Sequence, residues 1–393
     1  MKYTAEEVLQ YAAEENVKFI RLAFCDVTGR QRNLSILSGE LERAFAVGCA
    51  FDGSAIPGFG EGGRSDLFLR PDPATLTGLP WRPENGRVAR MFCDILRPDG
   101  TPFGRDVRAF LKGAVQRGER AGVRFHIGAE LEFYLFRTGE GGERTAEPLD
   151  RGGYMDVAPL DRGEDVRREI CLTLERMGIH PERSHHEEGP GQNEIDFRYA
   201  DPLTAADNTV TFRWVVETAA ARNGLWADFG PKPLPGQPGS GFHMNLSLES
   251  ADGRDLLPQA MGGILARVRD MTAFLNPCRE SYLRLGGDKA PRSIGWSEED
   301  RSRLIRVPAA GGERRRLELR SPDGMANPYL AFALLLHAVL DGLEEGLPVP
   351  ARGAAGPEAE LPLTLEEARK LAAESGFIKR HLPLSLREVL LGP

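Results

Sequence analysis

Residues 125–136 read FHIGAELEFYLF, and this stretch decides the fold. Apolar side chains occupy every second position from Phe125, whereas Glu130 and Glu132 share the opposite face of the predicted strand, about 7 Å apart at the normal rise of an extended chain. One apolar face and one carboxylate face predict a sheet that covers a core on one side and carries ionisable groups on the other.

Three later segments repeat this division into an apolar and a polar face. The polar faces carry Glu194 and Asp196 in residues 193–199, His243, Asn245 and Ser247 in residues 242–248, and Arg316, Glu318 and Arg320 in residues 316–320. A half-exposed sheet with a solvated outer face explains any one of these strands, but such a face usually mixes Lys, Thr, Gln and Ser. Crowded carboxylates repel one another unless cations bind between them, and oxygen ligands with a single imidazole suit Mg²⁺ or Mn²⁺. The four strands together therefore predict a divalent-metal site.

A turn and an arginine cluster extend this site. In residues 184–194 (SHHEEGPGQNE), Gly189-Pro190-Gly191 predicts a turn that returns Glu194 toward Glu187. Metal ions held by carboxylates beside arginines can stabilise the charge that develops during phosphoryl transfer from a nucleotide. The sequence contains no P-loop GxxxxGKS/T, so the phosphates would be bound by these groups instead. The arginines that predict the anion site are Arg301, Arg303, Arg306, Arg314, Arg315, Arg316 and Arg320.

Composition excludes several classes of protein. The 393 residues carry a net charge of −8, with 41% hydrophobic and 27% charged residues, which is typical of a globular protein and argues against a general binder of nucleic acids or anionic membranes. Five widely spaced cysteines without a CxxC pair predict reduced thiols rather than disulfides or a zinc site. At the N-terminus, Thr4 and Glu7 predict the start of a capped helix. This polar segment lacks the apolar core of a signal peptide, so we expect a cytoplasmic protein.

The order of elements predicts an α+β fold in two domains. Residues 18–37 predict a hairpin, and residues 86–95 predict a strand that ends in the turn Arg97-Pro98-Asp99-Gly100. The boundary is therefore placed near residue 102, which divides the chain into residues 1–102 and 103–393. The second part alternates short strands of a mostly antiparallel sheet with helices expected at residues 105–121, 165–177, 205–223, 256–275 and 328–342, and from about residue 364.

Ordered motifs over nearly the whole chain resemble the glutamine synthetase family, type I, and its Gram-positive branch most closely. They are residues 51–59 (FDGSAIPGF), 128–133 (GAELEF), 232–233 (KP), 239–248 (GSGFHMNLSL), 281–285 (SYLRL), 301–308 (RSRLIRVP), 317–320 (LELR) and 326–330 (ANPYL). The resemblance implies a small β-grasp N-terminal domain and a glutamine-synthetase-type catalytic domain with a curved antiparallel sheet. It also implies a homo-oligomer, a hexameric ring with its sites between neighbouring subunits.

The resemblance further implies roles for individual residues in a ligase that activates glutamate with ATP and condenses it with ammonia, using two or more Mg²⁺ or Mn²⁺ ions. One ion would be held by Glu132, Glu187 and Glu194, and another by Glu130, His243 and Glu318. ATP would contact Glu182, Phe197, Arg198, Tyr199, Asn245, Ser247 and Arg306, and glutamate would contact Gly239, Arg284 and Arg320. The catalytic positions would be Asp52, presented by the adjacent subunit, Arg301 and Lys289.

The sequence departs from the family pattern at residues that the resemblance places in the ammonium-binding and glutamate-binding sites. The flap reads Gly286-Gly287-Asp288-Lys289-Ala290-Pro291, one residue shorter than usual, and Lys289 stands where the family has a Glu that completes the ammonium pocket. Alternatively, Asp288 takes the role of this Glu. Ala55 replaces a serine near the pocket, and Pro238 replaces an asparagine that contacts glutamate. The sequence also ends at Pro393, before the helical tail that clasps a second ring, so we do not expect a double ring.

Three functions remain open on the sequence alone. The chain is a glutamine synthetase proper, a sister ligase of the same fold that uses a different amine or acid, or a catalytically weak paralogue that binds nucleotide and serves in regulation or assembly.

Overall fold

The computed structural model describes residues 3–60, 65–81, 86–287, 289–309, 315–349 and 360–392. Two predicted positions, Asp288 of the flap and Arg314 of the arginine cluster, lie outside these residues. The chain forms two compact units, of which the first contains Met1–Phe110, Glu175–Gly178 and Pro383–Pro393, and the second contains Leu111–Leu174 and Ile179–Leu382. The predicted boundary near residue 102 stays a prediction.

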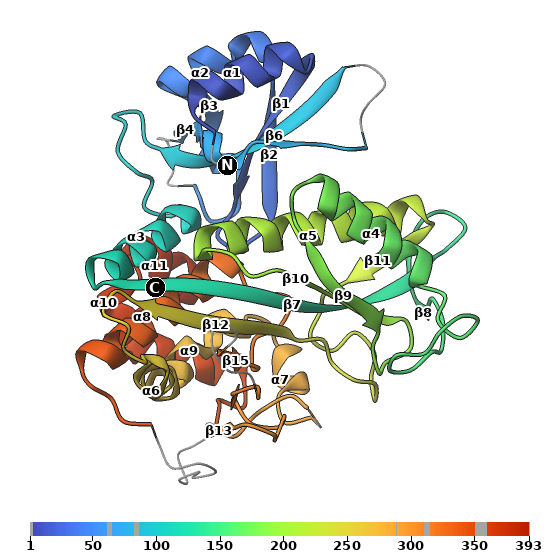
Figure 1. Cartoon of the computed structure of the whole chain (residues 1–393), viewed down its shortest axis with the longest axis vertical. Helices are drawn as coiled ribbons and strands as arrows, with labels where there is room; N and C mark the ends of the chain where they lie inside the picture. The colour runs from blue at the N-terminus through green and yellow to red at the C-terminus, as the bar shows by residue number, and fades with distance from the viewer. Residues whose placement is uncertain are drawn as a thin grey trace. The chain divides into compact units, whose positions relative to one another are not determined.

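The first unit is built on a small mixed sheet (Figure 1). Its strand order is β2 (Gln31–Leu37), β1 (Val17–Cys25), β6 (Arg87–Leu96), β4 (Asp66–Pro71) and β3 (Cys49–Asp52), and the short β5 (Thr77–Gly78) also pairs with β6. The pair β1–β2 is antiparallel and confirms the predicted hairpin, whereas β1–β6 is parallel. The helices are α1 (Ala5–Glu14), α2 (Leu41–Val47) and α11 (Leu384–Leu391). The capping box of Thr4 and Glu7 begins α1 as predicted.

The second unit is built on a large curved sheet. Its strand order is β13 (Trp296–Ser297), β14 (Ile305–Arg306), β15 (Leu317–Leu319), β12 (Phe242–Ser250), β7 (Val123–Thr138), β10 (Gln192–Phe197) and β9 (Pro181–His186), with β8 (Arg144–Pro148) and β11 (Leu225–Asp228) also paired to β7. Every described pair except β13–β14 is antiparallel, so the predicted α+β class with an antiparallel sheet is confirmed. Figure 1 shows β7 and β12 side by side at the centre of this sheet.

Helices cover the apolar face of the large sheet. Phe212 of α5 (Pro202–Arg222) packs against Phe133 of β7 and Phe197 of β10, with ring centroids 6.1 and 5.6 Å apart. Phe332 of α8 (Pro328–Glu344) lies 5.9 Å from Phe242 of β12. The other helices are α3 (Val107–Arg120), α4 (Glu164–Arg176), α6 (Leu257–Leu275), α7 (Ser281–Arg284), α9 (Leu365–Glu374) and α10 (Gly376–His381). Burial of these aromatic rings against the sheet leaves its other face for polar side chains.

Two glycines bring α6 and α8 into close contact. A Cβ atom added to Gly263 of α6 would lie 2.1 Å from the carbonyl oxygen of Ala338, and one added to Gly342 of α8 would lie 2.6 Å from the Cα of Gly263. Only glycine allows the two backbones to approach so closely. Nearly the whole length of α8 is buried, yet within the described residues the structure has no helix long and apolar enough to span a membrane.

Candidate active site

Strand register brings the predicted carboxylates together on the polar face of the large sheet. Residues that pair directly in an antiparallel sheet point to the same side. Glu130 pairs with His243 of β12 and with Asp196 of β10. One step along, Glu132 pairs with Glu194. Glu318 of β15 pairs with Asn245, on the same face as His243.

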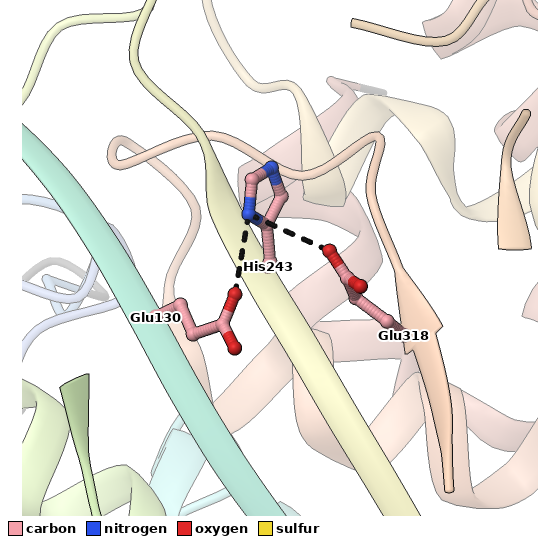
Figure 2. A group of neighbouring side chains, drawn as sticks. All are labelled: Glu130, His243 and Glu318. Carbon is pink, nitrogen blue, oxygen red and sulfur yellow. Dashed lines mark ion pairs between the residues drawn. The ribbon is translucent and has the colours of Figure 1, made fainter. Parts of the chain in front are cut away.

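Three of these side chains form a compact group, which Figure 2 shows converging from three neighbouring strands. His243 Nδ1 lies 3.5 Å from Glu130 Oε2 and 3.8 Å from Glu318 Oε1. His243 and Glu318 are buried, and one ligand atom from each of the three residues lies within 4.8 Å of the others. His243 Nε2 is also 4.0 Å from Glu132 Oε1, so this group adjoins the next carboxylate along β7.

A second group forms at the turn between β9 and β10. The amide of Glu187 donates to Gln192 O at 2.8 Å, and Gln192 N donates to Gly189 O at 2.9 Å, which confirms the predicted turn. The turn brings Glu187 back to Glu194, and one ligand atom each from His185, Glu187 and Glu194 lie within 4.8 Å of one another.

The electrostatics of the two groups fit divalent cations. Burial, together with the neighbouring carboxylates of Asp196 and Glu132, raises the pKa of Glu194 to about 12. Burial and the charge of Glu132 also raise the pKa of Glu187. Burial opposes ionisation of Glu130 as well, but the hydrogen bond and charge of His243 lower its pKa to about 2. The crowded carboxylates around Glu187 and Glu194, and the two carboxylates with one imidazole around Glu130, are hard donor sets that suit Mg²⁺ or Mn²⁺.

Arginines lie beside Glu318 and the residues that follow it. Arg306 Nη1 lies 2.9 Å from Glu318 Oε2, and Arg320 forms an ion pair with Glu318 Oε1. Arg284 is buried and donates to Ser321 O at 2.6 Å and to Arg320 O at 3.1 Å. Burial lowers the pKa of Arg284, against the opposing charge of Asp323. This side of the site therefore carries fixed positive charge.

Gly239 allows the backbone to approach Arg284. A Cβ atom there would lie 2.5 Å from Pro231 O and 2.8 Å from Arg284 Cγ. The neighbouring Pro238, which departs from the family pattern, accepts a hydrogen bond at its carbonyl oxygen from Tyr134 Oη at 2.7 Å.

The residues expected at ATP lie at three places on the second unit. Asn245 Nδ2 donates to Glu130 Oε1 at 2.9 Å, and Ser247 follows on the same face of β12. Tyr199 is 60% exposed, and Glu182 lies 4.0 Å from Arg198 in a weak surface contact. The Phe197 side chain is instead buried in the core, on the apolar face of the sheet.

The three predicted catalytic positions lie in different surroundings. Asp52 lies in the first unit at the end of β3, where hydrogen bonds from the Ser54 side chain and, next, the Ser65 side chain lower the pKa of its carboxyl group. Arg301 has an exposed side chain, and its carbonyl oxygen accepts from Arg320 Nε at 3.0 Å. Lys289 forms an ion pair with Glu188.

Sequence reasoning missed a polar layer behind the metal groups. His186 pairs with Asn193 and therefore lies on the opposite face from His185. Its Nε2 is 2.8 Å from Asp150 Oδ1 and its Nδ1 is 2.7 Å from Glu187 O, so the ring holds the backbone of a predicted metal ligand. The only signal in the sequence was the repeated His in residues 185–186, because Asp150 is distant along the chain.

Arg183 was given no role from the sequence, and Asp196 was placed only on the polar face of its strand. Arg183 Nη2 lies 2.6 Å from Asp196 Oδ2 and 3.7 Å from Glu130 Oε1. Alternation along residues 181–186 places Arg183 on the same face as His185 and was the signal that could have found it.

A two-part α+β chain with register-matched carboxylates beside arginines defines a metal-dependent enzyme of phosphoryl transfer. Two family models match the sequence: "Glutamine synthetase, beta-Grasp domain" over residues 16–98 and "Glutamine synthetase, catalytic domain" over residues 104–388. The chain belongs to the glutamine synthetase family and is, with that family, an ATP-dependent carbon–nitrogen ligase that uses divalent metal ions. The resemblance drawn from the motifs, including the β-grasp domain, is thereby confirmed.

Individual relatives are similar over most of their length. The glutamine synthetase of Clostridium saccharobutylicum is 44% identical over 99% of this chain and 89% of its own length, and that of Methanosarcina mazei is 48% identical over 87% and 79%. A solved structure of GmaS in complex with ADP superimposes with a TM-score of 0.87 at 30% identity, over 99% of this chain and 94% of its own.

Proposed function

We propose that this chain makes glutamine from glutamate, ammonia and ATP through a γ-glutamyl phosphate intermediate. The observation that carries the proposal is the strand register, which gathers Glu130, His243 and Glu318 into one group beside a second group containing Glu187 and Glu194. A γ-carboxylate oxygen of glutamate attacks the γ-phosphorus of ATP and ADP leaves. The nitrogen of ammonia then attacks the acyl carbon, phosphate leaves, and the amide forms.

The two groups are the proposed metal sites. Glu130, His243 and Glu318 are the proposed ligands of one Mg²⁺ or Mn²⁺ ion. Glu187 and Glu194 of the second group are proposed to hold the other ion together with Glu132, which pairs with Glu194 on the neighbouring strand, and His185 of that group lies beside them. Bound there, the ions neutralise charge that develops on the transferred phosphoryl group. His186 and Asp150 hold the carbonyl group of Glu187 from behind and so fix the turn that presents its carboxylate.

The arginines are the proposed anion site. Arg306 and Arg301 contact the phosphates, while Arg284 and Arg320 form the side that receives the carboxylates of glutamate. Arg306 and Arg320 pair with Glu318 in the structure, so they are already held at the edge of the proposed metal site. Gly239 lets its own backbone pass close to Arg284, and this backbone is the proposed contact for glutamate at that position.

The remaining ATP contacts follow from the placement of β9, β10 and β12. Asn245 and Ser247 lie on the polar face, and the exposed ring of Tyr199 is suited to stack on a base. Phe197 is proposed to contact ATP through its backbone, because its side chain lies in the core. Glu182 and Arg198 complete the set on the adjacent strand ends.

Asp52 is the proposed acceptor of the proton that ammonium must lose before it attacks. Hydrogen bonds from the Ser54 and Ser65 side chains lower the pKa of its carboxyl group and so favour the anion, whose negative charge attracts an ammonium ion. We propose that a neighbouring subunit of a hexameric ring presents it, and that the protein acts in the cytoplasm. The family relationship supports both points.

A sister ligase that uses a different amine is the second candidate. One observation favours it: Lys289 stands in the flap at the place where the family resemblance implies an acidic residue of the ammonium pocket. Purified protein with Mg²⁺, ATP and glutamate would be assayed for phosphate release with ammonia and then with a panel of amines. Ammonia-dependent glutamine formation supports the first function, phosphate release with another amine alone supports the second, and nucleotide binding without turnover supports a regulatory paralogue.

A further inference from the structure

The ion pair between Lys289 and Glu188 is not explained by metal or phosphate binding. Glu188 follows the proposed metal ligand Glu187, and its amide donates to Glu187 Oε2 at 3.0 Å. The ammonium group of Lys289 is paired with Glu188 Oε1. A positive charge from the flap sequence is therefore bound directly beside the second proposed metal group.

One aromatic ring also lies close to this ammonium group. Lys289 Nζ lies 5.7 Å from the centroid of the Tyr154 ring, within the range of a cation–π contact. The Tyr154 ring in turn stands edge-on to His185, with centroids 5.4 Å apart, and His185 belongs to the group with Glu187. A carboxylate and an aromatic face together form a binding place for an organic or inorganic ammonium ion.

The pair is accessible to a competing cation. The side chain of Lys289 is 53% exposed and that of Glu188 is 39% exposed. Exposed pairs of this kind are weak, and they exchange partners readily. The lysine backbone is held separately, because Arg320 Nη2 donates to Lys289 O at 3.3 Å, so the ammonium group can leave Glu188 without moving the chain.

We propose that Glu188 and Tyr154 receive the protonated amine acceptor, and that Lys289 is a built-in competitor which the substrate displaces. The end of a lysine side chain is itself a primary alkylammonium, so its position in the structure shows how ammonium or a small primary alkylammonium is bound there. The negative charge that the family places on the flap is supplied instead by Glu188. This inference rests on the proposed function and specifies how its amine is selected.

Steady-state kinetics with ammonium and with methylammonium test this inference. Lys289→Met removes the competitor, so KM for the amine should fall about two- to five-fold, the effect of one exposed ion pair. Glu188→Gln removes the receptor and should raise KM by at least as much. The double variant should behave like Glu188→Gln alone, and Lys289→Arg, which restores a competing cation, should stay near the wild-type value. KM for ATP and glutamate should change less than twofold throughout.

Two distant exposed residues provide matched controls. Lys379→Met and Glu140→Gln remove the same charges elsewhere and should leave KM for the amine unchanged. A rise of KM in Lys289→Met would mean that the lysine assists binding, and an unchanged KM in Glu188→Gln would mean that the carboxylate is no receptor. Either result overturns this inference while the wild-type enzyme stays active. Absence of amine-dependent turnover in the wild type would instead overturn the proposed function itself.

Discussion

Acid should destabilise this protein through one buried histidine, His337 in the middle of α8. Its side chain is 8% exposed, and Arg117 Nη1 lies 3.1 Å from its Nδ1. A guanidinium group can only donate, so Nδ1 accepts and the ring is neutral. Burial, then the stacked ring of His381 and the charge of Arg117, lower the pKa of His337 to about 3, although Asp341 opposes this shift.

The sign and size of the effect follow from proton linkage. Because the pKa of His337 is lower in the folded chain than its model value of 6.5, the unfolded chain binds more protons below that pH. The stability is therefore fully present above about pH 6.5 and is lost as pH falls toward 3. At pH 5 the folded ring is still neutral while the unfolded one is charged, which gives a loss of about 2 kcal/mol relative to pH 7. The size of this loss depends mainly on the pKa of His337 in the unfolded chain, because its pKa in the folded chain lies well below 5.

Denaturant unfolding at pH 7 and pH 5, at one fixed protein concentration, measures this loss. His337→Gln keeps an acceptor for Arg117 but does not titrate, so it should lose about 2 kcal/mol less than wild type between the two pH values. His180→Gln, at an exposed position, is the matched control and should lose as much as wild type. Equal losses in wild type and His337→Gln would refute the reasoning.

Three further predictions concern the metal groups and the helix packing. Glu130→Gln should remove the part of the thermal stabilisation by Mn²⁺ that comes from the site with His243 and Glu318, about 2.7 kcal/mol in wild type at 100 times the Kd of that site; a full wild-type shift in the variant contradicts the metal assignment. Asp150→Asn should weaken Mn²⁺ binding about tenfold in a calorimetric titration, because it loosens His186 behind the metal turn, and unchanged affinity would remove that role. Gly263→Ala should cost about 1–3 kcal/mol in unfolding experiments, whereas Gly113→Ala, where a Cβ meets nothing, should be neutral or stabilising; equal effects would contradict the close helix contact.

Which side chains share a face followed from the order of residues alone. Side chains alternate strictly along an extended chain, so Glu130 and Glu132 had to project together from β7, and His243 and Asn245 from β12. The turn before Glu194 was equally local, because Gly-Pro-Gly restricts the backbone wherever it occurs. Helix positions followed from apolar periodicity for the same reason, and α8 lies where its pattern predicted.

Which of these faces meet, and in what register, depends on how the folded chain packs. The alternation of side chains along one strand does not fix its register against the next strand. In the structure this register places Glu130 opposite His243. Contacts between distant loops were likewise beyond local rules: Asp150 behind His186, and Glu188 beside Lys289. The charge of Lys289 was plain from the sequence, but its partner was not, because an ion pair is fixed by distance in space and not by spacing along the chain.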